Sequence, residues 1–193
     1  LDTRAKAQTQ TILPMIVQGF AQTGIQTSDL TAISFSLGPG SFSGVRINAA
    51  VTQALAWSND IPVIPVSTLQ ALAQNAYREV GLTAVTAVLD ARMSEVYIAS
   101  FKLDENNIMQ AVDEEQLLSY EKAQNAVKYQ LIGSGAGLVN EEQIQYKGLS
   151  ATAEDIATIA RELAKHGKWL DAELALPVYL RDNAWKKIPE QGK

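Results

Sequence analysis

Apolar positions along the chain follow two periods, one typical of helices and one typical of strands. Helices are predicted over residues 4–24, 45–57, 67–78, 119–127 and 152–166, and strands over 30–37, 61–66, 85–90, 96–101 and 129–132. Thr152 is a good N-cap, and two acidic residues follow it in the first turn of the last helix. The strands at 85–90 and 96–101 are separated by a short polar turn and predict a hairpin. The pattern therefore predicts an α/β protein.

Two of the predicted helices carry more apolar surface than one face of a small sheet needs. The first is apolar on more than one side, so it is either buried on two sides or shared between the core and a partner. The second is apolar nearly all round and rich in alanine, which suits deep burial or a close helix pair. We expect the partner-facing positions to be Leu13, Ile16, Val17, Phe20, Ala49, Ala50, Gln53, Ala54 and Trp57.

Composition removes several classes of function. The 193 residues are 47% hydrophobic and 19% charged, with a formal charge of −5, one histidine and no cysteine. This excludes disulfide scaffolds, Cys/His zinc sites and thiol nucleophiles, and it disfavours a broad basic face for nucleic acid. No apolar run approaches the roughly 20 residues of a membrane span. We expect a cytoplasmic protein.

A glycine-rich segment at residues 38–44 lies between a predicted strand and a predicted helix. Such a loop can present backbone N–H groups to an anion, and a nearby arginine can add charge. The residues that would form this phosphate-type site are Gly38, Gly40, Ser41, Gly44 and Arg46. The segment lacks the Gly-Lys-Ser/Thr of a Walker motif, so a tight strand-to-helix turn is the favoured interpretation. A second glycine segment at 133–137 is a weaker candidate.

The chain also repeats one arrangement. Asp2 and Asp90 each stand in a Leu-Asp-Thr/Ala context, and each precedes a helix, a strand and a glycine loop. This predicts a duplicated α/β fold, with lobes at 1–66 and 67–193. After Asp90 comes a hairpin, whereas Asp2 leads directly into a helix, so we expect that residues are missing between Thr3 and Arg4.

Few side chains in the sequence suggest a catalytic site. His166 is the only histidine, and its place at the end of a predicted helix suits an interaction with the helix dipole. No metal site, cofactor site or Ser–His–Asp triad is expected. Trp185, Lys186 and Lys187 form a small basic and aromatic tail, for which a solvated terminus is favoured over RNA contact.

Four stretches, in order along the chain, resemble one family. LGPGSFSGVRI at 37–47, VSTL at 66–69, DARMSEVY at 90–97 and PVYLR at 177–181 are similar to motifs of the TsaB family, formerly YeaZ. The family has a longer N-terminal start, often His-Thr where Gln8-Thr9 stand, and commonly glycine where Asn48 stands. The resemblance covers essentially the whole chain.

The resemblance implies a duplicated actin-like, Hsp70-like fold and a non-catalytic role. TsaB-like proteins bind the catalytic subunit TsaD, work with the ATPase TsaE and form homodimers when alone. TsaD transfers a threonylcarbamoyl group to the adenosine beside the anticodon, so contact with tRNA is expected to be indirect. The alternatives are an actin-like ATPase or kinase and an inactive glycoprotease-like homologue.

Overall fold

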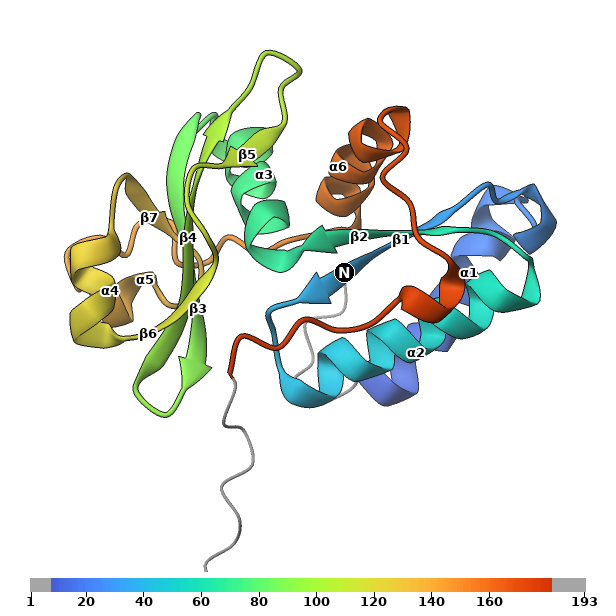
Figure 1. Cartoon of the computed structure of the whole chain (residues 1–193), viewed down its shortest axis with the longest axis horizontal. Helices are drawn as coiled ribbons and strands as arrows, with labels where there is room; N and C mark the ends of the chain where they lie inside the picture. The colour runs from blue at the N-terminus through green and yellow to red at the C-terminus, as the bar shows by residue number, and fades with distance from the viewer. Residues whose placement is uncertain (1–7, 182–193) are drawn as a thin grey trace, which may run out of the picture.

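The computed structural model describes residues 8–181, which form two sheets with helices between and around them (Figure 1). The helices are α1 (Gln8–Thr23), α2 (Phe42–Ser58), α3 (Thr68–Val80), α4 (Tyr120–Ala126), α5 (Ala136–Val139) and α6 (Ala153–Lys165), with 3-10 turns η1 (Thr27–Asp29) and η2 (Ala172–Leu174). The strands are β1 (Ile33–Gly38), β2 (Val63–Ser67), β3 (Ala84–Arg92), β4 (Glu95–Leu103), β5 (Met109–Ala111), β6 (Gln116–Ser119) and β7 (Gln130–Ile132). The predicted α/β class is confirmed.

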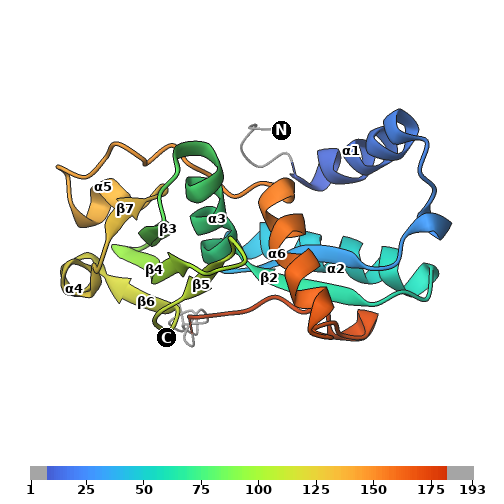
Figure 2. The same ribbon diagram turned by 90° about the horizontal axis from the view of Figure 1, so that it is seen from above.

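The first sheet pairs β1 with β2 in parallel, and α2 makes the crossover between them. One face of the sheet packs on α2 and η2 through a cluster formed by Phe35, Ala56, Val63 and Ala175. The other face packs on α6 through Ile64, Val66, Ile159 and Ala160. Helix α1 lies beside α2 on the outside of this half of the molecule (Figure 2). The small sheet is thus covered on both faces.

The second sheet has the order β5-β4-β3-β7, with β6 also paired to β4. The predicted hairpin is confirmed, since β3 and β4 pair antiparallel from Ala84 opposite Lys102 to Asp90 opposite Val96. Helix α3 covers one face through Leu69, Leu72, Ala73 and Ala76, and α4 and α5 cover the other. Strand β7 runs parallel to β3.

Helices α3 and α6 lie between the two sheets and contact each other (Figure 1). Helix α6 packs on β1 and β2, and Leu170 pairs with Val63 at the edge of the first sheet. The chain therefore returns to the first sheet after it completes the second. The division into lobes at residues 66 and 67 stays a prediction.

The structure corrects the start of one helix and adds two strands. Helix α2 begins at Phe42 and not at residue 45, because Ser41 caps it and accepts a hydrogen bond from the Gly44 amide (3.2 Å). Strands β5 and β6 were not predicted, since three or four residues are too few to establish an alternating pattern. The expected break between Thr3 and Arg4, the start of the first helix, Asp2 and the tail at 184–187 lie outside the described residues.

Candidate functional site

The glycine segment after β1 is shorter than its sequence suggests. Strand β1 ends at Gly38, and α2 begins four residues later with Ser41 as its N-cap. Gly44 therefore belongs to the first helical turn, where its amide is already used by the Ser41 hydroxyl. The loop proper is limited to Pro39, Gly40 and Ser41, and it reaches the helix by a tight turn.

Two glycines of this segment lie close to other parts of the chain. Gly38 has a φ of +113°, and a Cβ there would lie 3.3 Å from the carbonyl oxygen of Val178. A Cβ on Gly40 would lie 3.1 Å from a methyl group of Val45. The backbone conformation at Gly38 and its close approach to the later chain account for a glycine without any ligand.

Arg46, the cation expected to assist an anion, is held by aromatic residues instead. Its Nε donates to the Tyr179 hydroxyl at 2.8 Å, and its guanidinium lies 3.7 Å from the centroid of the Phe42 ring. The Tyr179 ring centroid is 5.6 Å away. These contacts fix the guanidinium against the C-terminal segment.

Close packing explains why glycine stands at two positions of the second glycine segment, residues 133–137. At Gly133, where φ is +88°, a Cβ would lie 2.5 Å from Leu72 Cδ2 and 2.6 Å from the Val88 carbonyl oxygen. At Gly135 a Cβ would lie 2.6 Å from Val88 Cγ1. Side chains of any kind are excluded here because the β7–α5 turn lies directly on β3 and α3.

The four sequence motifs, far apart along the chain, meet where the two sheets face each other. The Ser36 and Thr68 hydroxyls are 2.6 Å apart and link the ends of β1 and β2. The Val178 amide donates to the Leu37 carbonyl at 2.8 Å, so the C-terminal motif crosses the end of β1. Arg181 completes the arrangement by an ion pair with Glu95 at 2.6 Å. The sequence showed each motif but not this convergence.

The predicted partner surface is largely exposed on α1 and α2. Leu13, Val17 and Trp57 are 53%, 67% and 68% exposed. Ala50 and Ala54 are exposed, whereas Ile16, Phe20 and Gln53 are half-buried. Ala49 is 4% exposed and faces the core, so the structure removes it from the predicted surface. We call Leu13, Val17, Ala50, Ala54 and Trp57 the apolar face.

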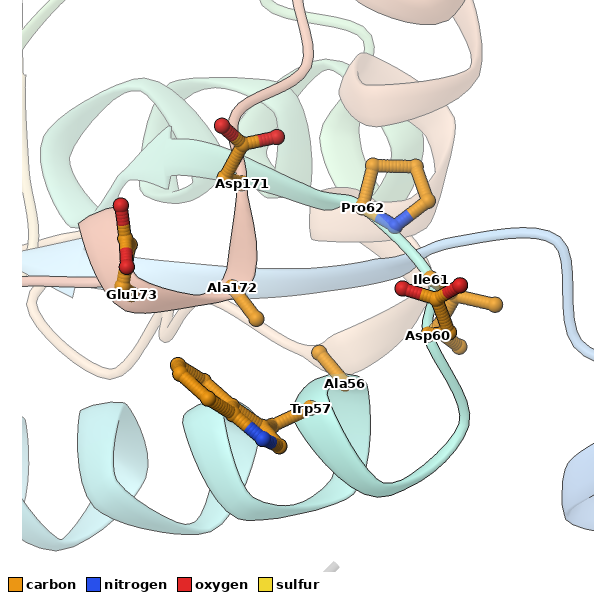
Figure 3. Close-up of a pocket in the computed structure, with 8 residues that line it drawn as sticks. All are labelled: Ala56, Trp57, Asp60, Ile61, Pro62, Asp171, Ala172 and Glu173. Atoms are coloured by element: carbon orange, nitrogen blue, oxygen red, sulfur yellow. The ribbon is translucent and has the colours of Figure 1, made fainter.

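A hollow of about 490 Å³ adjoins the apolar face at the end of α2 (Figure 3). Trp57 lines it together with three acidic residues, Asp60, Asp171 and Glu173. Sequence reasoning missed this feature, because η2 brings Asp171 and Glu173 to α2 from a distant part of the chain. The Gln53 side chain fixes η2 there by donating to the Glu173 carbonyl at 3.0 Å.

The described residues contain no gathering of three histidine, cysteine, aspartate or glutamate side chains that could hold a metal ion. His166 ends α6, as predicted, with its Nε2 3.3 Å from Glu162 Oε1. Among residues 8–181, no helix has both the length and the apolar character needed to cross a membrane.

The Glu115 carboxyl, next to Ser67 at the end of β2, has a shifted pKa. Ser67 caps α3 by accepting from the Leu69 and Gln70 amides, and its hydroxyl donates to Glu115 Oε1. Burial raises the pKa of Glu115, and the Ser67 hydrogen bond opposes this increase in part. The carboxyl therefore favours its neutral form more in the folded chain than in the unfolded chain.

We predict that Glu115→Gln stabilises the protein at neutral pH. A folded pKa above the unfolded one contributes stability below the unfolded pKa, and that contribution is lost as pH rises through the folded pKa. The urea midpoint of the variant should match the wild type at acidic pH and exceed it at pH 7. The matched control is Glu114→Gln at the exposed neighbouring position, with an unchanged midpoint. A lower midpoint for Glu115→Gln at pH 7 contradicts the prediction.

Comparison with known proteins gives consistent results. Residues 3–168 match the family model described as TsaD, tRNA N6-adenosine threonylcarbamoyltransferase. The tRNA threonylcarbamoyladenosine biosynthesis protein TsaB of Escherichia coli K12 is 38% identical over 95% of this chain and 85% of its own length. The TsaB protein of Haemophilus influenzae is 35% identical over 95% of this chain and 84% of its own.

Solved structures agree with these relatives. YeaZ from Pseudomonas aeruginosa has a TM-score of 0.83 and 38% identity, covering 90% of this chain and 85% of that one. A further P. aeruginosa crystal structure, of an uncharacterized protein with similarity to peptidase YeaZ, has a TM-score of 0.84 and 37% identity over 93% of this chain and 87% of that one. The duplicated actin-like class predicted from the motifs agrees with these neighbours and with the matched family model.

Proposed function

The chain belongs to the TsaB (YeaZ) family of tRNA threonylcarbamoyladenosine biosynthesis proteins, and we propose that it acts in that pathway as a non-catalytic subunit. In this proposal it binds a TsaD-type catalytic subunit in the cytoplasm and activates it. A TsaE-type ATPase takes part in the same modification reaction. The chain itself requires no metal and no cofactor, and it reaches tRNA through its partner.

One observation carries the proposal of a docking surface. Helices α1 and α2 together contain a single charged residue, Arg46, although both lie along an outer edge of the molecule (Figure 1). A helix that faces water on one side normally carries charges there, whereas the centre of a protein interface is depleted of them. Three large apolar side chains of the apolar face are more than half exposed. A pair of helices from a partner would cover this surface as a four-helix bundle.

The same surface supports a homodimer when the chain is alone. A two-fold arrangement places one apolar face against an identical one, which is the usual form of a symmetric dimer. The catalytic subunit and a second copy would then compete for one surface. Addition of a TsaD-type subunit should convert the homodimer into a heterodimer.

The alternative of an actin-like ATPase or kinase needs a phosphate loop in each lobe. The described geometry favours the scaffold, because a positive φ accounts for Gly38 and close packing accounts for Gly133 and Gly135 without a ligand. Arg46 is already bound to Tyr179. Binding of ATP with turnover by the isolated chain would overturn the scaffold proposal in favour of this alternative.

Reconstitution tests the proposal directly. The reaction contains tRNA, the threonylcarbamoyl adenylate, a TsaD-type subunit and a TsaE-type ATPase, with or without this chain. We expect the modified adenosine only when the chain is present, and none when the chain replaces the TsaD-type subunit. Undiminished modification without the chain excludes an activating role, and modification by the chain alone excludes a non-catalytic one. The product is measured by nucleoside mass spectrometry.

A further inference from the structure

The five residues Pro177–Arg181, here called the strap, connect the two halves of the molecule. After η2 the chain runs along α2 toward the turn between β3 and β4 (Figure 1). At one end the Val178 amide donates to the Leu37 carbonyl at 2.8 Å, and the Tyr179 hydroxyl accepts from Arg46 at 2.8 Å. This end is fixed to β1 of the first sheet and to α2, which packs on that sheet.

The other end of the strap is fixed to the second sheet through one arginine. Arg181 Nη2 lies 2.6 Å from Glu95 Oε2 and donates to the Ala91 carbonyl at 3.2 Å. Both acceptors flank the β3–β4 turn. The strap therefore spans from the carboxyl end of β1 to the carboxyl end of β3, the edge at which open α/β sheets form their crevice.

The turn that receives Arg181 has an unusual backbone. Arg92, Met93 and Ser94 have φ values of +63°, +56° and +60°, so three consecutive residues with side chains are left-handed. Each of them costs free energy relative to glycine, and such a run persists only where neighbouring contacts hold it. The contacts here include Arg181 on one side and the Asp90 carboxylate, which accepts from the Arg92 amide at 2.8 Å.

We propose that the strap and the left-handed turn together form a releasable latch between the two sheets. In the latched state Arg181 holds the turn in its strained conformation, and the strap ties the end of β1 to the end of β3. When Arg181 leaves Glu95, the turn relaxes, and the end of β1 and the end of β3 become free to separate.

The chemistry of the contacts suits release. The strap is attached to the second sheet by polar groups that remain partly open to water, since the Arg181 and Glu95 side chains are 20% and 33% exposed. An ion pair that stays partly open to water is weaker than a fully buried one, and water can take its place on release. The strain of the turn acts against the same contacts and therefore favours release.

Amide exchange measured by NMR on the full chain tests the latch. The Val178 amide reports on the strap, and the Arg92 amide reports on the turn. In Arg181→Ala we expect roughly tenfold faster exchange at both amides, the change that a loss of about 1.4 kcal/mol produces. The matched control is Arg161→Ala on α6, an exposed arginine for which the described residues provide no ion pair. Its exchange should equal that of the wild type.

A second variant separates the strap from the strain. Glycine adopts a positive φ without cost, so Ser94→Gly in the Arg181→Ala background should slow exchange at Arg92 again, while Val178 stays fast. Unchanged exchange in Arg181→Ala, or an equal increase in Arg161→Ala, overturns the latch. Equal exchange at Arg92 in the double and single variants likewise contradicts it, because the turn would then store no strain.

Discussion

Lysine in place of Val17 or Ala54 is expected to abolish association with a TsaD-type subunit while the isolated chain stays folded. Both positions belong to the apolar face, where Val17 is 67% exposed and Ala54 is exposed. A lysine there costs little in the monomer because its ammonium group remains in water. In a helix bundle the same group would be buried without a partner, and an unpaired buried charge costs several kcal/mol. We expect the dissociation constant to rise at least about 100-fold.

Matched controls carry the same substitutions elsewhere on the surface. Val112→Lys changes an exposed valine, 40% accessible, that follows β5 on the second sheet. Ala157→Lys changes an exposed alanine within α6. Calorimetric titration measures each association, and far-UV circular dichroism verifies that each variant is folded. Normal binding by both Val17→Lys and Ala54→Lys would place the docking surface somewhere other than α1 and α2.

The largest loss of stability is expected for Asp155→Ala. This carboxylate is 0% exposed between α3 and α6, and it accepts from Arg78 Nε at 2.8 Å and from Asn75 Nδ2 at 3.1 Å. It also accepts from the Thr152 amide at 3.0 Å, which completes the capping box of α6. The hydrogen bond to Asp155 is the main cause that raises the pKa of Arg78 above its ordinary value.

Removal of Asp155 leaves the Asn75 amide, itself 4% exposed, without this acceptor, while Arg78 keeps its ion pairs with Glu79 and Glu154. Arg78 is 31% exposed, so the loss comes mainly from the buried amide and from the cap. A buried hydrogen-bonding group left without its partner costs about 1–3 kcal/mol, and loss of a helix cap costs about 1 kcal/mol more. Because α6 covers the first sheet and α3 covers the second, the loss should affect the whole chain. Urea denaturation measures the free energy of unfolding.

The control for Asp155 is its neighbour in the same helical turn. Glu154 Oε2 lies 3.4 Å from Arg78 Nη1, but the side chain is 69% exposed. An exposed ion pair is worth about 0–1 kcal/mol, so Glu154→Ala should change stability by no more than that. If Asp155→Ala and Glu154→Ala prove equally stable, the buried network does not hold α3 and α6 together.

Local signals gave reliable predictions along much of the chain. Thr152 and Asp155 marked the start of α6, and the alternating residues on either side of the turn at 91–95 marked the β3–β4 hairpin. Caps, turns and periodic patterns depend on residues within a few positions of each other, so they can be read without the fold. The four family motifs likewise stood in the sequence.

Periodicity, caps and composition were enough to establish the α/β class, most of the helices and strands, and the excess of apolar residues in α1 and α2. The packing of the folded chain sets which of those residues are exposed, since Ala49 faces the core while Ala50 and Ala54 face outward. It also sets the burial of Asp155 and the path of the strap. Arg181 meets the Ala91 carbonyl across 90 residues of chain, and a contact of that separation depends on the packing of both sheets. A local sequence pattern cannot predict this contact, because the two residues come together only after the chain has folded.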